Sequence, residues 1–200
     1  SGISITKDII VQKVEDISEE TVKSLVETQY IEKFRKRALR PEAPVCRVGA
    51  QNPDVYFQGR ETTNKQYDAV PGIVQEYFDK VGAKTGRKFH LFDYVGAADA
   101  TDVIVCMGSG CEVVTDAVNY INQKKGGKVG LLIVRLYRPF ATEAFRKALP
   151  KTVKRIAVLD RTKEPGASGE PTYLDVVDAL KGQAVTIIGG RYGLSSKEFT

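Results

Sequence analysis

Cysteine is scarce in this sequence, and histidine is scarcer still. The 200 residues contain three cysteines and a single histidine, His90. So few cysteines, in an odd number, exclude a disulfide scaffold and are typical of a reducing compartment, where thiols stay free. Cys106 and Cys111 lie near each other in the chain but cannot form an iron–sulfur or zinc site alone, because such sites normally take about four ligands. We therefore predict free thiols and no metal site.

Long apolar runs and a large surplus of one charge are also lacking. No apolar run approaches the ~18 residues that a membrane helix needs, and the first residues lack the basic and apolar blocks of a signal peptide. The 30 basic and 25 acidic residues are interleaved and leave a net charge of +5. The densest basic cluster, residues 35–37 with Arg40, fits the solvated face of a helix. We expect a soluble, non-secreted protein with no membrane and no nucleic-acid partner.

What is present is a regular alternation of short apolar runs and helical patterns in the second part of the chain. The apolar runs that we expect to be strands are residues 89–94, 103–107, 129–137, 156–159 and 185–188. Helical patterns stand between them at residues 114–126, 144–150 and 174–182. This alternation predicts an α/β fold at residues 71–190, with a doubly wound, mainly parallel five-stranded sheet and helices on both faces.

The segments on either side of this domain have other patterns. Residues 1–70 are predicted to hold a helix, with apolar positions from Val22 to Phe34, and then a long extended connector rich in turn-forming residues. We expect both to pack on the domain. A new helix is expected to begin at Pro71, because proline fits the first helical position. Residues 191–200 are expected to begin a linker to a next domain.

A glycine turn from Met107 to Val113 follows one predicted strand. It departs from a dinucleotide fingerprint, which has a small residue where Val113 stands. Two interpretations stay open: the glycines permit a tight strand-to-helix turn, or their backbone amides bind an anion. A stand-alone NADP-type nucleotide-binding module, with Arg135 or Arg138 holding a 2′-phosphate, is accordingly the alternative function.

Two further loops after predicted strands are rich in arginine. Arg135, Arg138 and Arg161 lie at the carboxyl ends of strands, where open parallel sheets place ligands or partner surfaces. Acidic residues that can pair with them are Asp160, Glu164 and Glu170. Because arginine pairs with carboxylates in a fixed geometry, we favour a structural or interdomain salt network. We also expect His90 to be structural.

The loop at the end of the chain combines three glycines, two hydroxyls and two cations between Gly189 and Lys197. Flexible backbone amides, hydroxyls and cations are groups that bind phosphate. The spacing is not that of a Walker loop. A phosphate site and a linker into a next domain both remain open as interpretations.

Five blocks of the sequence carry a family resemblance. They are QNPDVYFQGRE at residues 51–61, LFDYVG at 91–96, VRLYRPF at 134–140, VLDRTKEPG at 158–166 and GRYGLSSKEF at 190–199. Together they resemble the pyruvate:ferredoxin (flavodoxin) oxidoreductase family, over almost the whole chain from about Phe34 to Thr200. The sequence departs from the family at Val48 and Gly49, where glycine and threonine are usual.

The resemblance implies that the chain is a fragment, similar to the second, transketolase C-terminal-like domain of a much longer enzyme. The parent is expected to use thiamine diphosphate with Mg²⁺ and [4Fe-4S] clusters. It would convert pyruvate and coenzyme A to acetyl-CoA and CO₂ while reducing ferredoxin or flavodoxin. The fragment is then a scaffolding, interdomain element with no catalytic residue, no bound cofactor and no activity of its own. Its partners are other domains of the same polypeptide, in a parent that is expected to be a homodimer.

The last block adjoins the coenzyme-A-associated third domain of that family. The resemblance therefore makes Arg191, Ser195, Ser196 and Lys197 candidates for binding a coenzyme A phosphate, in the same loop that the residue pattern indicated. The expected location of the parent is the cytoplasm, with an organelle of an anaerobic eukaryote as the alternative.

Overall fold

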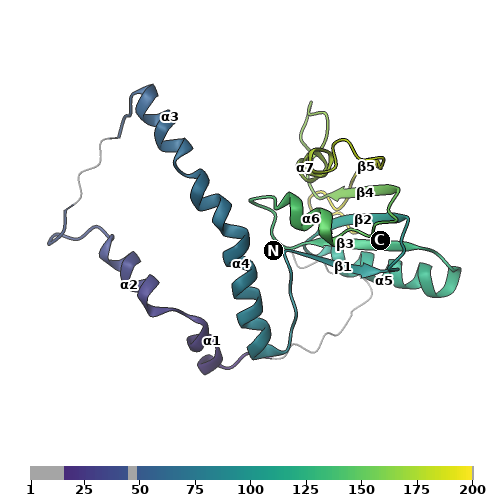
Figure 1. Ribbon diagram of the computed structural model, residues 1–200, viewed down its shortest axis with the longest axis horizontal. Helices are drawn as coiled ribbons and strands as arrows, with labels where there is room; N and C mark the ends of the chain where they lie inside the picture. Colours follow the sequence, from purple (N-terminus) through teal and green to yellow (C-terminus); the bar gives the residue numbers. More distant parts are fainter. Residues whose placement is uncertain (1–15, 45–48, 200) are drawn as a thin grey trace. The chain divides into compact units, whose positions relative to one another are not determined.

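The computed structural model describes residues 16–44 and 49–199. The described part of the chain divides into two compact units, one that ends at Lys88 and one that begins at Phe89. The described part of the first unit is helical, and the second holds the sheet (Figure 1). We call them the helical unit and the α/β unit.

The α/β unit is built on a five-stranded sheet. Its strands are β1 (Phe92–Gly96), β2 (Asp102–Met107), β3 (Val129–Val134), β4 (Arg155–Asp160) and β5 (Thr186–Arg191). Their order across the sheet is β1-β3-β2-β4-β5; β1 runs antiparallel to β3, and the other pairs are parallel. The predicted mainly parallel five-stranded sheet is confirmed.

Helices cover both faces of this sheet, as the alternation predicts. They are α5 (Gly110–Lys125), α6 (Thr142–Ala148) and α7 (Pro171–Ala179). The β2-to-β3 crossover runs in one direction across the sheet and the next two crossovers run in the other. Right-handed crossovers therefore place α5 on one face, and α6 and α7 on the opposite face. Accordingly α5 packs on β1, β2 and β3, whereas α7 packs on β4 and β5 (Figure 1).

Each face has its own apolar core. On the α5 side, Cys106, Val114, Val118 and Leu131 are buried together. Elsewhere in the unit Phe145 of α6 is completely buried, and its ring centroid lies 5.4 Å from that of Phe92 on β1. Removing this apolar surface from water is the main driving force for folding of the α/β unit.

The helical unit corrects part of the sequence prediction. Its helices are α1 (Glu19–Leu25), α2 (Thr28–Lys36), α3 (Pro53–Glu61) and α4 (Asn64–Thr85). The single predicted helix is two, because Val26 and Glu27 adopt extended backbone between α1 and α2. Here the Glu27 carboxylate accepts hydrogen bonds from Tyr77 Oη at 2.8 Å and Lys80 Nζ at 3.0 Å.

The predicted extended connector is also wrong, since α3 and the first turns of α4 lie within residues 41–70. Pro53 occupies the first turn of α3 with Asp54 beside it, so what resembled a turn is a helix start. Pro71 lies inside α4 rather than at its first position. The helix is already formed before this proline, whose inclusion removes one backbone hydrogen bond.

Because α4 continues through Pro71 to Thr85, the boundary between the units lies after this helix. The division lies between Lys88 and Phe89 rather than before Pro71. At the other end, residues 191–199 belong to the α/β unit, and the Tyr192 and Phe199 rings are in contact, 4.4 Å apart at their centroids. Packing of residues 1–70 on the domain, and a linker beginning at residue 191, stay predictions. Among the described helices none is long and apolar enough to cross a membrane.

Candidate functional site

The predicted phosphate loop lies at the carboxyl edge of the sheet, beside the first turn of α5. A small cleft there has a volume of about 10 Å³, enough for about one water molecule. It is lined by Ser109, Gly110, Val113, Arg161, Tyr192, Gly193, Lys197 and Phe199. The structure thus brings two of the predicted loops together, the glycine turn and the loop at the end of the chain.

The glycine turn is explained by backbone geometry and packing. Gly108 has φ +70°, a left-handed conformation that lets the chain turn sharply from β2 into α5. A Cβ atom on Gly110 would lie 2.6 Å from Tyr192 Oη, so only glycine admits this tyrosine against the first residue of α5. The structure therefore favours the tight-turn interpretation. The position where a dinucleotide phosphate would meet the helix is taken by the Tyr192 side chain, which counts against the nucleotide-binding alternative.

Cys106 and Cys111 lie behind this turn and are both buried and free, as predicted. Their thiols hydrogen bond to each other, and Cys106 Sγ also lies 3.6 Å from Tyr192 Oη. The hydrogen bond from Cys111 lowers the pKa of Cys106 to about 7. The same bond, together with burial, raises the pKa of Cys111. Across the described ranges no group of three or more metal-binding side chains occurs, so these residues do not fit an iron–sulfur cluster.

Arg191 is already paired. Its Nη1 donates to Glu170 Oε1 at 2.9 Å, and the Glu170 side chain is only 6% exposed. Burial alone would raise the pKa of Glu170, but hydrogen bonds from Arg191 and from the Glu164 amide bring it below its usual value. Glu170 thus pairs with Arg191 and not with Arg135, Arg138 or Arg161, for which the pairing was expected. Arg191 does not line the cleft.

The other three predicted phosphate residues follow Arg191 in one loop. Ser195 has φ +56°, and its carbonyl oxygen accepts a hydrogen bond from Arg161 Nη2 at 3.1 Å. Lys197 lines the cleft together with Ser109, and Ser196 is exposed. Only one predicted cation, Lys197, therefore reaches the cleft.

Arg161 and Tyr192 shape this loop, although neither is among the residues predicted to bind phosphate. Arg161 Nε donates to the carbonyl oxygen of Gly193 at 2.7 Å, in addition to its bond with Ser195. Tyr192 Oη donates to the carbonyl oxygen of Met107 at 3.3 Å. The only sequence signal was their place directly after strands, at the carboxyl edge of a parallel sheet.

Arg138 and Arg135 form ion pairs, as the sequence favours, but with Asp175 and Asp93 and not with Asp160, Glu164 or Glu170. Arg138 Nη1 donates to Asp175 Oδ2 at 2.7 Å. Asp160 departs from the expectation, since its buried carboxylate accepts hydrogen bonds from the amides of Thr172 and Tyr173, both at 3.1 Å. It therefore caps the N-terminus of α7 instead of pairing with an arginine.

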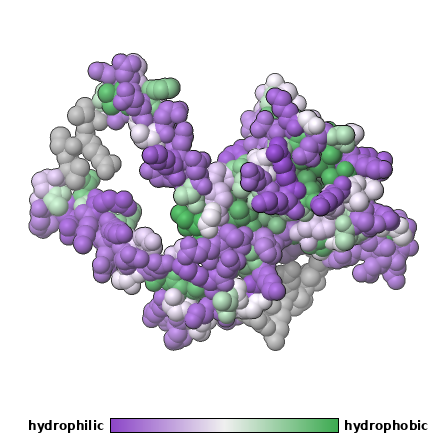
Figure 2. Space-filling model, in the orientation of Figure 1, coloured by the Kyte–Doolittle hydropathy of each residue, from purple (hydrophilic) through white to green (hydrophobic). Residues whose placement is uncertain are grey.

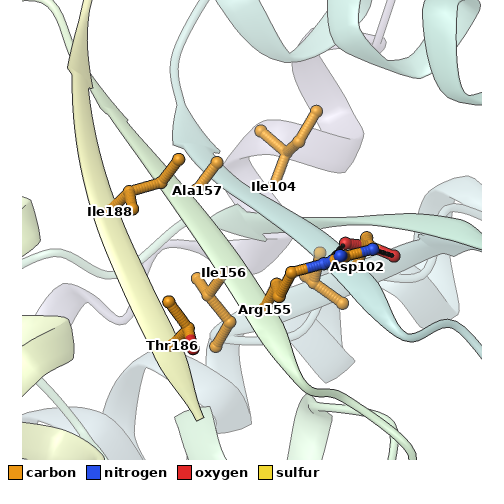
Figure 3. Close-up of a pocket in the computed structure, with 8 residues that line it drawn as sticks. Asp102, Ile104, Arg155, Ile156, Ala157, Thr186 and Ile188 are labelled. Carbon is orange, nitrogen blue, oxygen red and sulfur yellow. Dashed lines mark hydrogen bonds and ion pairs between the residues drawn. The ribbon is translucent and has the colours of Figure 1, made fainter.

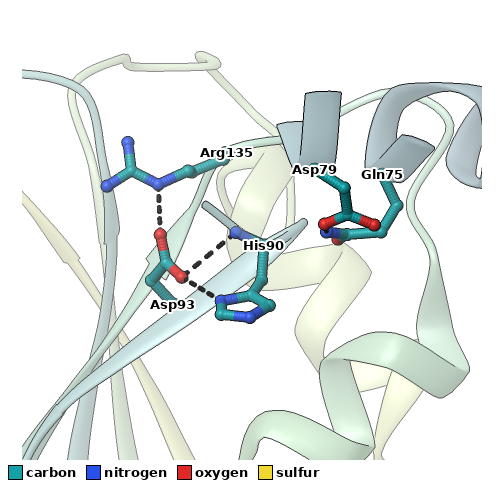
Figure 4. A network of polar contacts seen from close by, with 5 residues as sticks. All are labelled: Gln75, Asp79, His90, Asp93 and Arg135. Atoms are coloured by element: carbon teal, nitrogen blue, oxygen red, sulfur yellow. Dashed lines mark hydrogen bonds and ion pairs between the residues drawn. The ribbon is translucent and has the colours of Figure 1, made fainter. Parts of the chain in front are cut away.

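The single histidine belongs to this network as well (Figure 4). His90 lies just before β1, and its Nδ1 is 2.8 Å from Asp93 Oδ1. Arg135 Nε donates to the other oxygen of the same carboxylate, and the guanidinium lies 4.7 Å above the Phe89 ring. These contacts join the start of β1 to the end of β3. They support the structural interpretation of His90 and engage the arginine that a 2′-phosphate would need.

Two family models match the chain. The model described as pyruvate:ferredoxin oxidoreductase core domain II matches residues 100–199. A second, described as pyruvate flavodoxin/ferredoxin oxidoreductase, thiamine diP-binding, matches residues 5–79. The two models thus divide the chain much as its compact units do.

Curated relatives are similar over nearly the whole chain. A pyruvate:ferredoxin oxidoreductase of Moorella thermoacetica is 56% identical over 94% of this chain and 16% of its own length. A pyruvate-flavodoxin oxidoreductase of Trichormus variabilis is 53% identical over 95% of this chain and 16% of its own length. A 2-oxoglutarate:ferredoxin oxidoreductase structure from Magnetococcus marinus matches 76% of this chain and 22% of that one, at 17% identity and a TM-score of 0.39. The chain thus spans 16% of the length of these two curated relatives.

Proposed function

The chain belongs to the pyruvate:ferredoxin oxidoreductase family, and from that premise we propose that it is the scaffolding, interdomain part of such an enzyme. The parent would oxidatively decarboxylate pyruvate with coenzyme A, giving acetyl-CoA and CO₂, and pass two electrons to ferredoxin or flavodoxin. The contribution of this chain is positional. It holds neighbouring domains so that their reacting groups meet in the correct geometry, which is where much of an enzyme's rate acceleration arises.

The observation that carries this proposal is the exposed apolar surface of the helical unit. No residue of α1, α2, α3 or α4 is buried. Even large aromatic side chains are exposed there, Phe34 by 70% and Phe57 by 67%. Figure 2 shows apolar residues at the surface of these helices, among mostly hydrophilic ones. Large exposed apolar residues occur on all four helices, among them Val22, Tyr30, Val55 and Ile73, which favours a binding surface over a purely solvated one. Other domains of the parent polypeptide are the partners that we propose for it.

Thiamine diphosphate, Mg²⁺ and the iron–sulfur clusters belong, in this proposal, to other domains of the parent. The described residues do not gather the ligands that a cluster needs. We further propose a homodimeric, cytoplasmic parent that meets its electron acceptor outside this chain.

The test separates the activity of the chain from that of its parent. Supplied with pyruvate, coenzyme A, thiamine diphosphate, Mg²⁺ and an electron acceptor, the 200-residue chain should form no acetyl-CoA, whereas the parent should form it. Phe34→Asp with Phe57→Asp should abolish assembly and activity of the parent while leaving the α/β unit of the chain folded. Glu32→Ala, on the opposite face of α2 from Phe34, is the matched control. Turnover by the isolated chain would overturn the proposal.

For the terminal loop we propose contact with a phosphate of coenzyme A through Arg191, Ser195, Ser196 and Lys197. Its support is that Lys197 lines the cleft and that the neighbouring Ser196 is exposed, because cations and hydroxyls are groups that bind phosphate. Arg191 would have to share its guanidinium between Glu170 and the ligand, which its half-exposed side chain permits.

Calorimetric titration of the chain with coenzyme A tests this assignment. Arg191→Ala with Lys197→Ala should weaken binding at least about tenfold, because one charged hydrogen bond contributes ~1.5–3 kcal/mol. Lys147→Ala with Lys151→Ala removes the same charge elsewhere on the α/β unit and should change nothing. Absence of binding to the chain and to the parent, or equal binding by both double variants, would remove the loop from the coenzyme A site.

A further inference from the structure

One face of the sheet is only partly covered. Parallel register places Asp102, Arg155 and Thr186 in one row across β2, β4 and β5. The next row on the same face is Ile104, Ala157 and Ile188. Ile104 packs against the cluster that α5 covers, so both rows lie on the α5 side of the sheet.

These two rows enclose an apolar hollow of about 280 Å³ over β4 and β5 (Figure 3). We call it the β4–β5 hollow. Ile188 at its edge is 61% exposed, although it lies in the middle of a strand. Ala157 forms the floor, since its small side chain leaves space between the two isoleucines. At one end, Arg155 Nη2 donates to Asp102 Oδ2 at 2.9 Å.

The size of the hollow fits one helix. On this face α5 packs on β1, β2 and β3, and within the described ranges no helix packs on the same side of β4 and β5. Neighbouring strands lie ~4.8 Å apart, so these two strands present a surface about 10 Å wide. An α-helix with its side chains is about 10–12 Å across. Doubly wound sheets cover both faces with helices in this way.

We propose that the β4–β5 hollow is the docking site of one amphipathic helix, which the parent polypeptide supplies from outside these 200 residues. The helix would lay an apolar stripe along Ile104, Ala157 and Ile188, with one large aliphatic side chain entering above Ala157. Its polar residues would meet the Arg155–Asp102 pair at one end. The proposal rests on the proposed function, because that function provides the parent.

The rest of the parent is the favoured source for two reasons. The curated relatives are about six times longer than the matched segment, so ample polypeptide is present to supply a helix. A second copy of the chain fits less well, because a two-fold contact would place two hollows opposite each other and fill neither.

The direct test is a photo-crosslink within the purified parent. A benzophenone side chain replaces Ile188, and in a control it replaces Tyr120, an exposed residue of α5. We expect position 188 to crosslink in high yield to one helical segment of the same polypeptide outside these 200 residues, and position 120 not to reach that segment. Crosslinks to a second subunit, to any residue of this chain or to nothing would each overturn the proposal.

A pair of variants gives an independent readout. Ile188→Glu should leave hydrogen exchange of β5 amides unchanged in the isolated chain, where residue 188 already faces water. In the parent it should speed that exchange about tenfold or more, because a carboxylate cannot be buried under an apolar helix. Ala157→Leu, which fills the hollow, should do the same in the parent without disturbing the chain. Equal behaviour in chain and parent would overturn the docking, and acetyl-CoA formation by the isolated chain would overturn only the proposed function.

Discussion

The two units of this molecule use similar apolar residues in opposite ways. Every buried hydrophobic residue of the described chain lies between Leu91 and Leu180, inside the α/β unit. The helical unit also contains large apolar residues, but Val22, Phe34 and Phe57 all face outward. Its α1, α2 and α3 have seven to nine residues each. Isolated helices shorter than ~12–15 residues are marginal in water.

The difference teaches where each unit obtains its stability. The α/β unit buries its own core and should fold by itself. The helical unit has a few polar links of its own, such as those of Glu27 with α4, and needs another surface to bury its apolar faces. In the α/β unit, exposed apolar residues such as Ile188 surround a core that is already formed, whereas α1, α2, α3 and α4 have no buried residue behind theirs.

The largest expected effect comes from removing equivalent rings in the two units. Phe145→Ala should destabilise the α/β unit by ~3–5 kcal/mol, because a completely buried ring leaves a cavity. Phe57→Ala should change the stability of the isolated chain by less than ~0.5 kcal/mol. Urea titration gives the free energy of unfolding of each variant, with hydrogen exchange of the strand amides as the probe of unfolding. Similar losses for the two variants would contradict the contrast between the units.

Glycine-to-alanine substitutions should have opposite signs in the two units. Gly110→Ala should cost about 1–3 kcal/mol, because the new Cβ would force Tyr192 away from the start of α5. Gly72, inside α4, has no atom within 4 Å of such a Cβ. Gly72→Ala should therefore stabilise the helical unit by ~0.5–1 kcal/mol. Thermal unfolding of each variant gives the sign, and a stabilising Gly110→Ala would mean that Tyr192 does not pack there.

The smallest expected effect is the loss of the contact between Glu27 and α4 at low pH. Hydrogen bonds from Lys80, and then from Tyr77, lower the pKa of Glu27 from its ordinary value of 4.5 to about 2. A lowered carboxyl pKa stabilises the link to α4 fully above pH 4.5, and this contribution is lost as the pH falls through about 2. Exchange of the α1 amides should therefore accelerate between pH 4.5 and 2, relative to amides of β3. Glu27→Gln should remove this difference in pH dependence.

Much of the α/β unit could be predicted from the sequence, because its strands are short runs of buried β-branched and aliphatic residues. The C-terminal end of α5 could also be predicted, because glycine commonly follows the last helical residue. Gly126 is the C-cap of α5 and has φ +62°. The helical unit was harder. Asn52, Pro53 and Pro71 are turn formers by composition, but the structure uses the two prolines within helices.

The sequence predicted where the candidate site lies but not which of its residues contact one another. Loops that directly follow predicted strands were expected at the carboxyl edge of the sheet, where parallel sheets place their ligands. The contacts within that edge join residues far apart in the chain, such as Arg161 with Ser195 and Met107 with Tyr192. Local patterns do not encode such pairings. The sequence therefore left a tight turn and an anion site both open at Gly110, and only the contact with the Tyr192 ring shows why glycine is needed there.

Tyr192 has one more consequence. Because it is covalently part of the chain, it behaves as a tethered ligand at the start of α5, with an effective concentration that dilution cannot lower. Short tethers give effective concentrations in the mM range. A free nucleotide would have to displace this side chain before reaching the helix amides. The turn is therefore expected to keep one conformation while nucleotide levels rise and fall.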